Sequence, residues 1–235
     1  MSNTQKKEKT QIGIIGIPHT GTFPWQTTMS ILSLKLPVNT IVKYHLVGSC
    51  LIYDARDKII NFAEKQNADW VLFFDSDMIV PADSIIKFIN TRLEGKELDV
   101  VGGICFKRTP PFQPCFYTKA RIDAKTKKPV LESPIDFPEK GLLSVEGLGM
   151  ACTFIRKKAW RAIKEKTGHC FFPFPGVGED LSFCIRARMA DIKMFVDLSI
   201  NVGHVAQIDI RKEHFFAAKQ EHMEKYPDKP LFNEV

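Results

Sequence analysis

Short apolar runs alternate with longer segments of mixed polarity along most of the chain. Runs in which nearly every residue is apolar are typical of strands buried on both faces of a sheet. Strands are predicted at 12–17, 44–47, 70–74, 100–104, 142–145, 150–155 and 194–196. Helices are predicted at 25–36, 54–66, 81–93, 157–166 and 179–190, with Asp54 as the N-cap of the second. This alternation predicts an α/β fold, a single mostly parallel sheet with helices on both faces.

The two ends of the chain break the pattern. Residues 1–11 are polar and rich in lysine, which predicts a disordered leader. Residues 207–235 are expected to form a basic helical tail, so one domain spans 12–206. Within that domain, residues 107–140 are rich in proline and lysine and predict a long loop or a small hairpin.

Composition narrows the class of protein. Of the 235 residues 44% are hydrophobic and 26% are charged, as in ordinary globular proteins. The net charge of +6 fits either a solvated basic surface or an anionic partner, such as a nucleoside diphosphate, a polyanion or a membrane surface. No apolar run is long enough to span a membrane, and no secretory signal is visible. A cytoplasmic protein with six reduced cysteines is therefore expected, and the lack of a C-x-x-C pair argues against zinc.

The strongest chemical signal follows the predicted strand at 70–74. Asp75 and Asp77, separated by Ser76, leave the carboxyl end of a buried strand, where ligands of α/β sheets bind. Two carboxylates so close repel each other, and a hard divalent cation relieves that repulsion. The plainer alternative makes both aspartates turn and capping residues ahead of the helix at 81.

Two later signals are weaker by themselves. Glu179 and Asp180 open a helix after a glycine-rich loop, where acids favour the helix dipole, but where a carboxylate could also act as a general base. His204 follows a short strand; it is either an ordinary packed histidine or a third metal ligand beside the two aspartates. Arg56 lies in the first turn of its helix, where a cation opposes the dipole; this suggests phosphate binding, and the alternative is an exposed, solvated arginine.

Together these segments resemble the GT-A-fold glycosyltransferases, especially the family 2-like group. The segments that carry the resemblance are 55–58, 68–78 with its Asp-x-Asp, 146–156 with Gly149, 178–188 with its Glu-Asp pair, and 202–204 with its histidine. They cover roughly residues 12–206 and occur in the order expected of that family. Two positions depart from its pattern, since Asp57 stands where members often have asparagine and Val177 where they often have an aromatic residue.

The resemblance implies roles for matched positions. Pro18, Arg56, Asp75, Ser76 and Gly149 would contact a nucleotide-sugar donor. Asp75, Asp77 and His204 would bind Mn²⁺ or Mg²⁺. Asp180, or else Glu179, would be the base that deprotonates an acceptor hydroxyl, giving inversion. The expected activity is transfer of a sugar from a nucleoside-diphosphate sugar to an acceptor hydroxyl; the acceptor is unknown and could be a glycan, a lipid-linked molecule, a protein or a modified nucleic acid.

Other interpretations stay open at this point. A retaining glycosyltransferase of the same fold would not use the Glu-Asp pair as an attacking-side base. The basic segments at 119–128 and 211–225 would also suit a nucleic-acid-directed glycosyltransferase or a nucleic-acid-binding protein. A nucleotidyltransferase fits poorly, because residues 17–21 lack a glycine-rich phosphate loop.

Overall fold

The computed structural model describes residues 10–206 apart from 110, 124 and 127, together with 212, 216, 217, 220, 221 and 224. The first compact unit is Met1–Val205, and Ala206–Val235 forms the second. The predicted leader and tail lie almost entirely outside the described residues. Gln11, assigned to the leader, is the first residue of β1 (Gln11–Pro18). Within the described residues, no helix is both long and apolar enough to cross a membrane.

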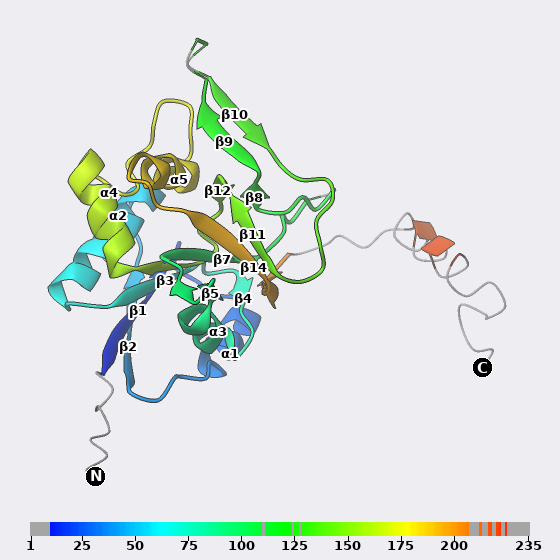
Figure 1. Cartoon of the computed structure of the whole chain (residues 1–235). Helices are drawn as coiled ribbons and strands as arrows, with labels where there is room; N and C mark the ends of the chain where they lie inside the picture. The colour runs from blue at the N-terminus through cyan, green and yellow to red at the C-terminus, as the bar shows by residue number, and fades with distance from the viewer. Residues whose placement is uncertain are drawn as a thin grey trace. The chain divides into compact units, whose positions relative to one another are not determined.

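A seven-stranded sheet forms the centre of the first unit (Figure 1). Its strands stand in the order β11 (Leu142–Val145), β14 (Met194–Asn201), β7 (Val100–Ile104), β13 (Cys152–Arg156), β3 (Trp70–Phe74), β1 and β2 (Thr40–Val47). All seven predicted strands are present. The runs at 70–74, 100–104 and 142–145 match their strands residue for residue. For β3 and β7 the reason is burial, because a strand covered on both faces has few polar positions.

The prediction of a mostly parallel sheet is wrong, since the sheet is mixed. β1, β2 and β3 run parallel to one another, and β14 runs parallel to β7. β13 lies antiparallel between β3 and β7, and β11 is antiparallel to β14. Apolar runs predict burial but not strand direction, and the return strand β13 is as fully buried as its neighbours.

Helices cover both faces of the sheet, as the alternation of elements predicted. The helices are α1 (Trp25–Leu32), α2 (Ile52–Lys65), α3 (Ser84–Asn90), α4 (Lys157–Thr167) and α5 (Glu179–Met189). Residues of α2, α4 and α5 share one hydrophobic core with the sheet, and residues of α1 and α3 pack in the other. Figure 1 shows these two layers on opposite sides of the sheet.

The ends of the helices depart from the prediction. Leu51, and not Asp54, is the N-cap of α2, and Asp54 instead forms an ion pair with Lys58 one turn later. The helix predicted at 81–93 is shortened to α3, because the segment that follows pairs as β5 (Arg92–Leu93) with β6 (Lys96–Glu97). Local periodicity shows that a helix exists, whereas its ends depend on neighbouring elements.

The expected excursion at 107–140 contains a hairpin. β9 (Lys119–Ile122) pairs antiparallel with β10 (Pro129–Glu132), and this hairpin extends away from the sheet in Figure 1. Before it, β8 (Phe116–Tyr117) pairs with β12 (Gly147–Leu148), which ties the excursion back to the segment leading into β13. The excursion therefore borders the carboxyl edge of β3 and β7.

Two glycines of the central sheet differ sharply in the space around them. A Cβ atom on Gly13 in β1 would lie 2.0 Å from the Trp70 ring, whereas one on Gly102 in β7 would meet its nearest neighbour at 3.6 Å. We therefore expect Gly13→Ala to lower the free energy of unfolding by about 2–3 kcal/mol, because Trp70 is fully buried and has no room to move. Gly102→Ala is the matched control and should change the free energy of unfolding by less than about 1 kcal/mol. Urea denaturation measures both; equal losses would contradict this packing argument.

Candidate active site

The carboxyl ends of β1, β3 and β7 lie at one edge of the sheet, and the candidate residues gather there. Asp75 follows β3 directly, and its backbone N–H donates to the Ala151 carbonyl oxygen at 3.0 Å, just before β13 begins. After Asp77 the chain forms β4 (Met78–Ile79), which pairs antiparallel with β15 (Gly203–His204). This two-residue ladder brings His204, 127 residues away along the chain, beside Asp77.

Asp77 and His204 are in direct contact. Nε2 of His204 lies 3.3 Å from Oδ2 of Asp77, and Nδ1 lies 2.9 Å from the carbonyl oxygen of Phe106. Because a carbonyl oxygen only accepts, Nδ1 carries a proton and Nε2 faces the carboxylate. The Asp77 carboxylate raises the pKa of His204, and His204, together with Arg108 at 3.1 Å, lowers the pKa of Asp77.

Arg56 links two of the other candidate acids. Its Nη2 lies 3.0 Å from Oδ1 of Asp75 and its Nε lies 3.3 Å from Oε1 of Glu179. Only 3% of the Arg56 side chain is exposed, and its guanidinium stacks 5.4 Å from the centre of the Phe73 ring. The sequence suggests phosphate binding for this arginine; the structure shows that it is buried and that its guanidinium pairs with two carboxylates.

Asp180 has a different environment from Glu179. Its Oδ1 accepts a hydrogen bond from the Leu181 N–H at 2.7 Å, and no ion pair to it is present among the described residues. Desolvation raises the pKa of Asp180, and the negative charge of Glu179 adds to the rise. Asp180 therefore holds a proton more tightly than an ordinary aspartate does.

All nine predicted site residues line two adjoining cavities. The first, of about 320 Å³, is lined by 14 residues that include Arg56, Gly149, Glu179, Asp180 and His204. The second, of about 390 Å³, is lined by residues that include Pro18 and Ser76. Asp75 and Asp77 line both cavities, so the two spaces meet at the Asp-x-Asp segment.

Sequence reasoning missed one wall of the first cavity. Lys107, Arg108, Cys115 and Tyr117 line it from the segment that follows β7. The available signal was Lys107-Arg108, a basic pair just beyond the carboxyl end of a buried strand. Because β7 runs in the same direction as β3, Lys107 and Arg108 lie at the same end of the sheet as Asp75.

The geometry fits a metal ion only in part. Among the described residues no group of three or more His, Cys, Asp and Glu is arranged to hold a metal, and Asp75 is turned to Arg56. Asp77 and His204 do have the chemistry of two ligands. An imidazole that donates Nδ1–H to a backbone carbonyl and directs Nε2 at a carboxylate has the usual orientation of a metal-binding histidine. A magnesium-like ion commonly takes one or two protein ligands and completes its shell with phosphate oxygens and water.

Comparison with known proteins shows similarity at the level of fold. No protein-family model matches the sequence, and no curated protein has a similar sequence. Among solved structures, A197 from STIV superposes with a TM-score of 0.55 at 18% identity, over 84% of this chain and 86% of that one. GalNAc-T7, a GT-A glycosyltransferase solved with UDP, GalNAc and Mn²⁺, superposes with a TM-score of 0.56 at 9% identity. That match covers 86% of this chain, which spans 45% of the length of GalNAc-T7.

The ion pairs of Arg56 give a stability prediction. Arg56→Gln would leave Asp75 and Glu179 near each other without a buried cation, so we expect the free energy of unfolding to fall by about 3 kcal/mol. Arg161→Gln is the matched control: Arg161 pairs with Glu64 but is 56% exposed, so its loss should cost much less stability than the loss of Arg56. Chemical denaturation of both variants measures the difference. An Arg56→Gln variant as stable as Arg161→Gln would contradict the role assigned to Arg56.

Proposed function

We propose that this protein is a glycosyltransferase of GT-A fold that moves a sugar from a nucleoside-diphosphate sugar to an acceptor hydroxyl. The observation that carries the proposal is the convergence of Asp77, His204 and Asp180 on one cavity at the carboxyl edge of the sheet. The likeness of fold to GalNAc-T7 supports it. So does the second cavity beside the end of β1, which offers room for the nucleoside next to the Asp-x-Asp segment.

Asp77 and His204 are the proposed ligands of Mn²⁺ or Mg²⁺, with Asp75 beside them. When bound, the cation would supply neutralising charge to the departing nucleoside diphosphate. Lys107 and Arg108 line the same cavity and would add positive charge toward phosphate oxygens. Arg56 is proposed to act indirectly, because its ion pairs hold Asp75 and Glu179 in place.

Asp180 is the better of the two candidates for the base. Glu179 is engaged by Arg56, whereas Asp180 lines the cavity without a paired cation. Its raised pKa makes it a stronger proton acceptor than an ordinary aspartate once it is ionised. Gly149 leaves the space in front of it open, since a Cβ atom there would lie 4.0 Å from Asp180 Oδ2. As Asp180 takes the proton, the acceptor oxygen would attack the anomeric carbon from the face opposite the nucleoside diphosphate; the bond from that carbon to the diphosphate oxygen would break, and the configuration would invert.

The donor and the metal can be tested together. We expect thermal unfolding in a panel of UDP-, GDP-, CMP- and dTDP-sugars to be shifted upward by one nucleotide class, and more strongly with Mn²⁺ present. A ligand at 100 times its dissociation constant stabilises by about 2.7 kcal/mol. Asp77→Ala should lose the additional shift from Mn²⁺ while remaining folded, and Asp83→Ala, an exposed aspartate at the start of α3, should keep it. An undiminished Mn²⁺ effect in Asp77→Ala would refute the metal assignment.

The role of Asp180 predicts a pH dependence. A base works only when ionised, so kcat/KM should fall as the pH falls through a pKa that lies above the ordinary aspartate value of 3.8. Desolvation, together with the charges of Glu179 and Asp75, raises this pKa, and Arg56 opposes the rise. The Tyr117, Cys115 and Cys184 side chains also interact electrostatically with Asp180.

Asp180→Asn should lower kcat by at least about 100-fold, because the base is removed. The pH dependence should disappear with it, and the affinity for the donor should be retained. Asp191→Asn is the control, since Asp191 is exposed and its φ of 57° suits asparagine equally well. Loss of donor affinity with transfer otherwise normal would make Asp180 a binding residue instead.

A further inference from the structure

Two cysteines lie opposite each other at the edge of the first cavity. Cys105 directly follows β7, and the Cys115 N–H donates to the Cys105 carbonyl oxygen at 2.9 Å. The neighbouring residues Phe106 and Pro114 form an antiparallel bridge, so Cys105 and Cys115 occupy facing positions of a short strand pair. Side chains at facing positions point to the same side of such a pair, and their Cα atoms are about 4.5–5.5 Å apart.

The two thiols are in direct contact. The Cys105 thiol donates a hydrogen bond to the Cys115 sulfur, and both side chains pack in the same hydrophobic core. A disulfide requires Cα atoms about 4.4–6.8 Å apart and Cβ atoms that face each other, and facing residues of an antiparallel pair meet both conditions. A disulfide between Cys105 and Cys115 therefore requires only a short approach of the two sulfur atoms.

Of these two cysteines, only Cys115 lines the cavity. It is half-buried beside Gly149, on which a Cβ atom would lie 3.5 Å from the Cβ atom of Cys115. Cys105 is 4% exposed and does not line the cavity. The hydrogen bond between the thiols lowers the pKa of Cys115 and raises the pKa of Cys105. An accessible sulfur with thiolate character beside a second thiol is the usual arrangement of an oxidisable cysteine pair.

The other four cysteines, all of which the structure describes, have different surroundings. Cys170 and Cys184 are buried in the other hydrophobic core. Cys152 is buried in the same core as Cys105, but its interaction with Cys105 is electrostatic and no hydrogen bond joins the two thiols. Cys50 is exposed and bonds to Asp54. The contact between thiols at the cavity thus belongs to Cys105 and Cys115.

We propose that Cys105 and Cys115 are an oxidation site, at which a peroxide converts the two thiols into a reversible disulfide. The Cys115 thiolate attacks one peroxide oxygen, the O–O bond breaks, and the departing hydroxide takes up a proton, which leaves Cys115 as a sulfenic acid and releases water. The Cys105 sulfur then attacks the Cys115 sulfur. The S–S bond forms, the S–O bond breaks, and the hydroxide leaves with the Cys105 proton as a second water. The two thiols together lose two electrons, which reduce the peroxide.

The disulfide would form beside the basic wall of the cavity. Lys107 and Arg108 lie between the two cysteines in the sequence and line the cavity, and Arg108 pairs with Asp77 at 3.1 Å. A covalent link between Cys105 and Cys115 restricts the conformations open to both basic residues. The oxidation site is defined by the two thiols alone, so it does not depend on the glycosyltransferase assignment.

Peptide mapping of the full-length protein tests the proposal directly. Trypsin cleaves between the two cysteines, so Cys105 and Cys115 leave the reduced protein in separate peptides, 97–107 and 109–119. The folded protein is treated with a small molar excess of hydrogen peroxide, its remaining thiols are alkylated, and it is digested without reductant. We expect the two peptides to be joined by a disulfide in chains that run as monomers on a non-reducing gel. Dithiothreitol, which is itself oxidised to a cyclic disulfide, should release both peptides.

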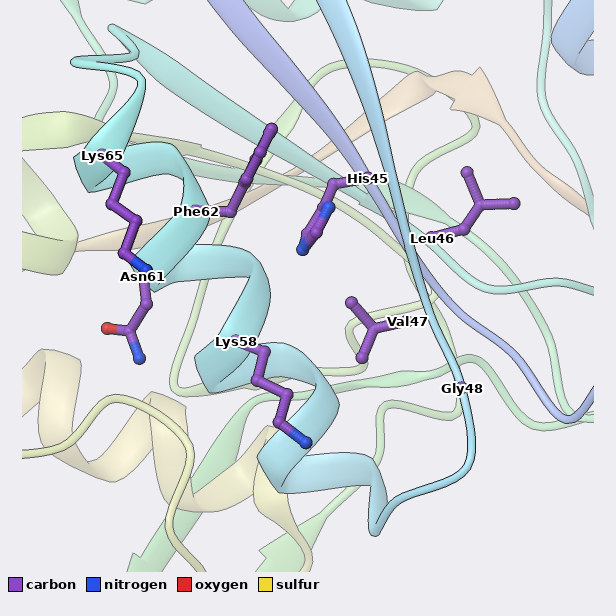
Figure 2. A pocket seen from close by; sticks show the side chains of 8 residues that line it. All are labelled: His45, Leu46, Val47, Gly48, Lys58, Asn61, Phe62 and Lys65. Atoms are coloured by element: carbon purple, nitrogen blue, oxygen red, sulfur yellow. The ribbon is translucent and has the colours of Figure 1, made fainter.

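Cys50→Ser is the matched control for Cys115→Ser. Cys50 is exposed, does not line the first cavity, and lies two residues beyond Gly48, which lines the groove of about 510 Å³ between β2 and α2 (Figure 2). Cys115→Ser should abolish the linked peptides, and Cys50→Ser should leave them unchanged. A digest of the peroxide-treated protein without the linked peptides would overturn the proposal. A link from 97–107 to 141–156, the peptide that contains Cys152, would also overturn it.

Discussion

The crowding of carboxylates at one edge of a buried sheet is the constraint on which this structure depends. Asp75, Asp77, Glu179 and Asp180 all line one cavity, and their mutual repulsion in a partly desolvated space requires compensation. Arg56 compensates Asp75 and Glu179 from inside the protein, and His204 with Arg108 compensates Asp77. Asp180 is left without a paired cation among the described residues, and desolvation, together with the negative charge of Glu179, raises its pKa. The four acids therefore differ in their ion pairs: Asp75, Glu179 and Asp77 each contact a basic side chain, and Asp180 has no such ion pair among the described residues.

The topology explains how this crowding is built. β3 and β7 run in the same direction, so the segments that follow them emerge together, and the antiparallel β13 between them begins where they end. Three chain segments thus meet at one edge, and the N-terminus of α5 adds Glu179 and Asp180 to it. The short β4–β15 ladder then fixes His204 against Asp77. The antiparallel direction of β13 does not disturb this arrangement. Its N-terminal end lies at the same side of the sheet as the carboxyl ends of β3 and β7.

Most of the elements can be predicted from the sequence alone. The apolar run of β3 marks a strand buried on both faces, and Asp75, Asp77, Glu179 and Asp180 are candidate residues because acids that follow such a strand or begin a helix are informative. The sequence did not determine that the sheet is mixed, since strand direction leaves no trace in composition. Nor did it reveal that Arg56 bonds to Asp75 and Glu179, or that Lys107 and Arg108 line the cavity. These depend on contacts between residues far apart in the chain, and only the tertiary structure decides which side chains meet.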